Sequence, residues 1–116
     1  MILDQINGNP RYVLIGETAR RRYYIHCSGK VLSISKSNCS YRKWIRERNN
    51  RGIKSVRIGN KDLSVLNLLV EGFYSFYLRS YGPNYRVIFI NGNREDIRIR
   101  NICVQIGEFT NVQSNC

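Results

Sequence analysis

The stretch DLSVLNLLVEGFYSFY, from Asp62 to Tyr77, carries the strongest helical signal in the chain and decides its fold. Its apolar residues recur at the spacing of one helical face at Leu63, Leu66, Val70, Phe73, Tyr74 and Tyr77. Asp62 is a favourable N-cap, and Gly72 leaves room for a neighbouring element. Because Leu68, Leu69 and Phe76 widen the apolar face, we expect one helix from Asp62 to about Tyr77 at the centre of the core.

The segments on both sides of this helix have the composition of antiparallel strands, which predicts an α+β fold. Strands are expected before the helix at 12–15, 22–26, 31–35 and 53–58, with a tight turn at 27–30. The segment 37–51 has few hydrophobic residues and suits either a short helix or a loop. After the helix, a strand over 86–90 meets Asn91-Gly92, the strongest hairpin signal in the chain, with Ile97, Ile99 and Ile102 on the far side.

The length of 116 residues suits one domain with one core. We expect an N-terminal tail over 1–10, a single domain over 11–104 and a C-terminal tail over 105–116. No apolar run approaches the roughly 20 residues of a membrane-spanning helix, and the first ten residues lack the pattern of a secretory signal. We therefore expect a cytoplasmic protein with no membrane partner and no small-molecule substrate.

The positive charge is concentrated in the first half of the chain. The formal net charge is +11, with thirteen basic and two acidic residues between Arg11 and Arg57, so this segment carries the whole surplus. The rest of the chain is neutral. The sequence pI of about 10.0 predicts a polyanionic partner.

Arginine predominates over lysine in the basic half, which favours nucleic acid because the guanidinium group binds phosphate oxygens and guanine edges through two donors. Tyr23, Tyr24, Tyr41 and Trp44 are interleaved with the charges; they suit either stacking on bases or packing in the core. We expect DNA rather than RNA, with single-stranded targets left open. The expected contact residues are Arg20, Arg21, Arg22, Lys30, Arg42, Lys43, Trp44, Arg46, Arg48, Arg51, Lys54 and Arg57.

The four cysteines, Cys27, Cys39, Cys103 and Cys116, form no C-x-x-C pair. We interpret them as reduced structural thiols, while a zinc site assembled from all four stays open because distant ligands can meet in a fold. No cofactor is expected.

The order of these signals resembles the HNH homing endonuclease-like proteins of phages and introns. The matching text is VLNLLVEGF at 65–73, FINGN at 89–93 and Arg100-Asn101-Ile102. The segment YIHCSGKVLSI at 24–34 is similar to an element that often precedes the nuclease core. The resemblance spans roughly 12–104 and implies a ββα-metal-like core over 61–104, preceded by a basic half over 11–60. It also implies a phage or mobile element as the source, and hence the cytoplasm of a host cell.

The residues that would carry HNH chemistry are replaced in this chain. Phe89 stands at the position of the general base, Ile88 where an acidic metal ligand is often found, and Asn91 at the aspartate of the motif. Phenylalanine cannot accept a proton, and isoleucine cannot bind a hard cation. The resemblance leaves Gly92 for the turn and Asn101 to tie the hairpin to a following helix. We therefore expect a protein that is not an enzyme.

The leading hypothesis is a DNA-binding protein that resembles an inactive HNH endonuclease and acts by occupancy rather than cleavage. One alternative is a small phage-type inhibitor or accessory protein that binds an acidic protein surface, of the host or of the phage. Another is a metal-dependent nuclease with relocated ligands. An unrelated α+β domain with a chance Ile90-Asn91-Gly92-Asn93 turn is the remaining interpretation.

Overall fold

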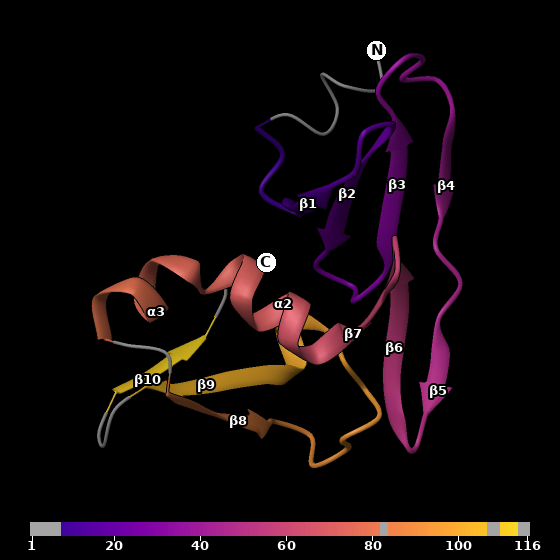
Figure 1. Ribbon diagram of the computed structural model, residues 1–116. Helices are drawn as coiled ribbons and strands as arrows, with labels where there is room; N and C mark the ends of the chain where they lie inside the picture. The colour runs from indigo at the N-terminus through magenta and orange to yellow at the C-terminus, as the bar shows by residue number, and fades with distance from the viewer. Residues whose placement is uncertain (1–7, 82–83, 107–109, 114–116) are drawn as a thin grey trace.

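The computed structural model describes residues 8–81, 84–106 and 110–113 and has an α+β architecture (Figure 1). The elements follow the order β1 (Tyr12–Glu17), β2 (Arg21–His26), β3 (Val31–Ser35), β4 (Arg42–Trp44), β5 (Arg48–Asn50), β6 (Ile53–Ile58), β7 (Lys61–Ser64), α2 (Val65–Phe73), α3 (Ser75–Tyr81), β8 (Tyr85–Phe89), the 3-10 turn η1 (Ile99–Asn101), β9 (Ile102–Ile106) and β10 (Thr110–Gln113). All strands pair antiparallel, in sheets of order β1-β2-β3-β4, β5-β6-β7 and β10-β9-β8. Helix α2 lies between the first and the third of these sheets, and β5-β6-β7 flanks both (Figure 1).

The core forms around α2, as its apolar pattern predicts. Val65, Leu69 and Val70 of the helix are fully buried, and they join Ile25 and Ile102 in one cluster. An added Cβ on Gly72 would lie 3.2 Å from the Ile25 side chain, so the expected close approach at this glycine is confirmed.

The predicted limits of the helix were wrong at both ends. Asp62 lies in β7, where it pairs with Arg57, and Ser64 is the N-cap, accepting a hydrogen bond from the Asn67 amide at 3.4 Å. The β6–β7 turn extends the hairpin up to Ser64 and overrides the capping preference of Asp62. Helix α2 ends at Phe73 because the backbone of Tyr74 leaves helical geometry (φ −112°, ψ 19°), and α3 begins at Ser75.

The segment 37–51 contains two short strands, β4 and β5, joined by irregular stretches, so the expectation of a short helix or a loop missed both strands. β4 pairs with β3, and β5 pairs with β6. All six residues of the two strands are exposed. Such outer strands form because their backbone groups complete the ladder of a neighbour, and they need no apolar face of their own.

The β-hairpin predicted after the helix is present as the antiparallel pair β8 and β9, but the two-residue turn predicted at Asn91-Gly92 was wrong. β8 pairs with β9 through Phe89↔Ile102, so residues 90–101 form a long connection that holds Ile97 and η1. Gly92 still makes a turn there, with φ 77° and its amide donating to the Phe89 carbonyl at 2.9 Å. The side chain of Asn101, 4% exposed, accepts from the Asn91 amide at 2.9 Å and donates to the Asp96 carbonyl at 2.9 Å.

After Asn101 the chain continues as strand β9, where the resemblance implies a helix. β9 pairs on its other side with β10, which lies in the segment 105–116. The β10 pairing extends the third sheet beyond the hairpin.

Candidate nucleic-acid interface

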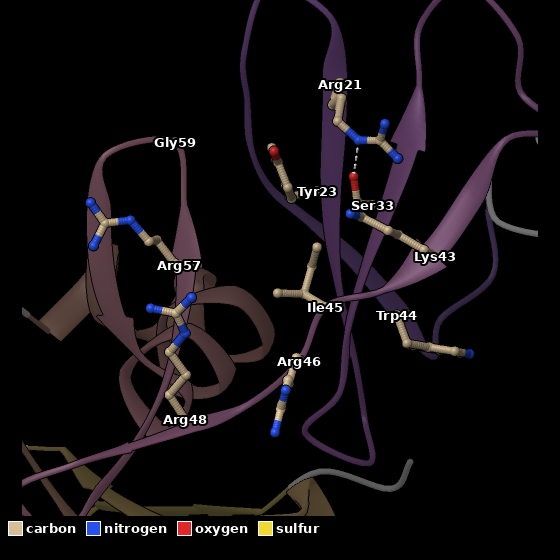
Figure 2. Close-up of a pocket in the computed structure, with 10 residues that line it drawn as sticks. All are labelled: Arg21, Tyr23, Ser33, Lys43, Trp44, Ile45, Arg46, Arg48, Arg57 and Gly59. Atoms are coloured by element: carbon tan, nitrogen blue, oxygen red, sulfur yellow. Dashed lines mark hydrogen bonds between the residues drawn. The ribbon is translucent and has the colours of Figure 1, made fainter.

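One face of the first sheet places polar and basic side chains side by side across three strands. Tyr23 of β2 pairs with Ser33 of β3, and Ser33 pairs with Lys43 of β4. Directly paired residues point to the same face of a sheet, so these three side chains form one row. Arg21 lies on the same face, two residues before Tyr23, and its Nε donates a hydrogen bond to the Ser33 hydroxyl (Figure 2).

A second group of cations faces this row from the opposite side. β4 continues through Ile45 and Arg46 into β5, which begins at Arg48, and β5 pairs with β6, which holds Arg57. Figure 2 shows Arg48 and Arg57 on the β5–β6 side and Lys43 on the side of the first sheet, with Ile45 between them.

Together these elements enclose a pocket of about 530 Å³, which we call the basic pocket. Its lining consists of Arg21, Tyr23, Ser33, Lys43, Trp44, Ile45, Arg46, Arg48, Arg57 and Gly59. Five of these residues are cationic, four of them arginine, and none is acidic. Cations gathered without opposing charge repel one another, and a bound polyanion relieves that repulsion.

The cations of the basic pocket are largely available to a ligand. Within the described ranges, Lys43, Arg46 and Arg48 make no ion pair. Arg57 lies 3.5 Å from the Asp62 carboxylate, but both side chains are nearly half exposed, so solvent screens the pair. Arg21 is held by Ser33, a buried polar residue within the apolar strand VLSIS, which sequence reasoning overlooked.

Trp44 belongs to the rim of the basic pocket, and its ring is turned away from the interior (Figure 2). Trp44 is 49% exposed, and the centroid of its ring lies 6.2 Å from that of the His26 ring, edge to face. Tyr23, the other aromatic residue of the lining, is only 7% exposed. The interior therefore offers charged donors and no open aromatic face for a base.

The structure brings six of the twelve predicted contact residues to the basic pocket: Arg21, Lys43, Trp44, Arg46, Arg48 and Arg57. Arg20 lines a neighbouring hollow of about 460 Å³ that shares Arg21. Lys54 lines a separate hollow beside β8 and lies 3.5 Å from Glu47. The others lie elsewhere on the surface: Arg22 and Arg42 alternate onto the opposite sheet face, while Lys30 and Arg51 occupy the turns before β3 and β6.

Two titratable groups beside this region have shifted pKa values. A hydrogen bond and the charge of Lys36 lower the pKa of Glu17, whose carboxylate lies 3.2 Å from the Lys36 ammonium. Burial lowers the pKa of His26, assisted by the charges of Arg11 and Lys30. Its Nδ1 accepts from the Ser28 amide at 3.1 Å, which requires the neutral ring nitrogen.

The thiols of Cys27, Cys39 and Cys103 are free, and Cys116 lies outside the described residues. Among the residues that the structure describes, no three His, Cys, Asp or Glu side chains gather where they would hold a metal ion. Nor does any helix in the described ranges have the length and apolar character to cross a membrane.

No protein-family model, curated protein or solved structure matches the chain.

Proposed function

We propose that this protein binds nucleic acid, DNA by preference, through the basic pocket, and that it acts by occupancy rather than by cleavage. The observation that carries the proposal is the convergence of five cationic side chains, from β2, β4, the β4–β5 connection, β5 and β6, on one pocket without an acidic residue. A polyanion is the ligand that this arrangement favours.

Phosphate groups are the part of the nucleic acid that the basic pocket suits best. Arginine presents a planar set of donors that fits two phosphate oxygens at once, and four of the five cations are arginine. Base stacking requires an open aromatic face, which the buried Tyr23 and the outward-turned Trp44 do not supply. Binding would then depend on the backbone, with little discrimination among sequences.

For the second half we propose an HNH-type core whose catalytic residues are replaced. One support is that Phe89 stands at the position of the general base. Another is Asn101, whose side chain hydrogen-bonds to the backbone of Asn91 and Asp96 in the connection after β8. The course of β9 differs from the helix of that family, so the proposed relationship rests on the chain up to Asn101. Occupancy without cleavage follows from the chemistry of Phe89, since its ring cannot activate water.

The test is a mobility-shift assay with duplex DNA, single-stranded DNA and RNA at two salt concentrations. We expect duplex DNA to bind at low salt and to dissociate as salt rises. Absence of binding to every nucleic acid at low salt would refute the proposal. A protein partner that survives nuclease treatment in a pull-down would then favour the alternative of an acidic protein surface.

Cleavage is tested separately by incubating supercoiled plasmid with the protein and magnesium or manganese. We expect the plasmid to stay intact, because no group at position 89 can accept a proton. Nicking that disappears on addition of a chelator would instead support a nuclease with relocated ligands.

A further inference from the structure

A second hollow, of about 480 Å³, lies between strand β8 and the start of β6, and we call it the β8 groove. Its lining combines an apolar floor of Ile53, Leu66, Val87, Phe89 and Ile97 with the cations Lys54, Arg86 and Arg94. No acidic side chain lines it. This chemistry differs from that of the basic pocket, whose lining is mainly cationic.

The β8 groove follows an open strand edge. β8 is the last strand of its sheet and pairs only with β9 among the described strands. Arg86 and Val87 are consecutive, and consecutive strand residues point to opposite faces. The lining takes in both residues and so includes side chains from both faces of β8, whose outer edge carries backbone N–H and C=O groups that no described strand pairs.

We propose that the β8 groove is a docking site for an extended acidic peptide segment of a partner protein, which adds to β8 as a further strand. The β8 backbone would supply hydrogen bonds, the floor would take an apolar side chain, and the cations would bind carboxylates. Three observations favour this occupant over others: the open edge, the apolar floor and the positive charge of Arg86 and Arg94, which no carboxylate in the described part of the chain pairs. A second copy of this chain fits poorly, because both copies carry a net charge of +11.

Two features show that the groove is available. Ile53 is 55% exposed although it is a large aliphatic side chain. Arg86 and Arg94 are exposed and make no ion pair with any residue in the described part of the chain. A carboxylate that binds these arginines would not have to displace an existing partner.

The test uses the full chain and a fluorescein-labelled peptide of alternating glutamate and valine, about seven residues long to span the strand. We expect the peptide to bind in fluorescence anisotropy, and a serine-for-valine version of equal charge to bind about tenfold more weakly. The double variant Arg86→Glu/Arg94→Glu should weaken binding at least about tenfold, since both carboxylate contacts become repulsive. The variant Ile53→Ser should also weaken it.

Matched control variants distinguish an effect of the groove residues on peptide affinity from a general effect of net charge or of exposed apolar area. The variants Arg11→Glu/Arg79→Glu and Leu14→Ser change exposed residues elsewhere, Leu14 being 51% exposed, and should alter affinity by less than about twofold. In NMR spectra the peptide should shift the Arg86–Phe89 amides and slow their hydrogen exchange.

No binding, an equal loss in the control variants, or amide shifts confined to β2–β4 would each overturn the proposal. The last result would mean that the peptide binds as a general anion at the basic pocket. Because the β8 groove shares no lining residue with the basic pocket, its failure leaves the proposed nucleic-acid function untouched.

Discussion

Replacing Lys43, Arg46 and Arg48 together with glutamine removes three of the five cations of the basic pocket. All three side chains are exposed and make no ion pair within the described residues, so the fold should tolerate the change. Arg21 and Arg57 are left in place because they contact Ser33 and Asp62.

The magnitude follows from counterion release. If each pocket cation neutralises one phosphate, the logarithm of the association constant should fall with the logarithm of salt concentration with a slope of about −4.5, and of about −1.8 in the triple variant. Between about 50 and 200 mM salt the wild type should then lose about 500-fold in affinity and the variant about tenfold. At low salt the variant should bind more weakly than the wild type.

The assay is fluorescence anisotropy with a labelled DNA duplex across a salt series. The control variant Arg11→Gln/Lys30→Gln/Arg79→Gln changes the net charge equally, but its residues lie outside the basic pocket. We expect the control to keep most of the wild-type slope. If both triple variants flatten the slope equally, binding depends on total charge, and the assignment of the basic pocket is refuted.

Four further outcomes test the fold and its surroundings. Gly29→Ala should destabilise the protein by at least about 2 kcal/mol in urea unfolding, because φ is +86° and a Cβ would overlap the Ile97 carbonyl. The control Gly52→Ala has a similar φ of +83° but no atom near the added Cβ, so it should destabilise the protein by only about 1 kcal/mol. Asn101→Ala should cost about 2–3 kcal/mol, since it leaves the Asn91 amide and the Asp96 carbonyl without their partner; the exposed Asn84→Ala should cost little. The pKa of His26 lies below its ordinary value of 6.5 in the folded state, so the unfolded chain binds more protons as the pH falls. The free energy of unfolding should therefore decrease as the pH drops through 6.5. The variant His26→Gln should remove the contribution of this group to the decrease. Trp44→Ala should change DNA affinity by less than about twofold, and a larger loss would show that the ring stacks on the ligand.

The strands of the first half were predictable because each carries a run of β-branched and aromatic residues bounded by turn residues. Those expected over 12–15, 22–26, 31–35 and 53–58 all lie within observed strands or overlap them, and Gly29, with φ +86°, forms part of the turn before β3. The burial of Val65, Leu69 and Val70 also followed from the helical spacing. Local patterns were sufficient where one face of an element is buried.

Other elements depend on long-range contacts that leave no local pattern. Asp62 looked like an N-cap, but pairing with Arg57 places it in a strand. The polar strands β4 and β5 exist only because β3 and β6 lie beside them. The connection over 90–101 is held by Asn101, ten residues from the Asn91 amide that it binds.

The basic residues were recognisable as a set, but the sequence could not show which of them converge. The register Tyr23↔Ser33↔Lys43 and the pairing of β5 with β6 bring five together and direct Arg22 and Arg42 to the other face. Of the cations of the β8 groove, Lys54 was among the predicted contact residues, whereas Arg86 and Arg94 were missed because they lie in a half of the chain whose charges cancel.

Whether duplex DNA occupies the basic pocket can be measured by NMR titration of the labelled protein with a short duplex. We expect the amide signals of Arg21, Ser33, Lys43, Arg46, Arg48 and Arg57 to shift together and to saturate at a common DNA concentration. If these signals stay unchanged at low salt, or the shifts gather on another surface, the proposal that duplex DNA occupies the basic pocket is contradicted.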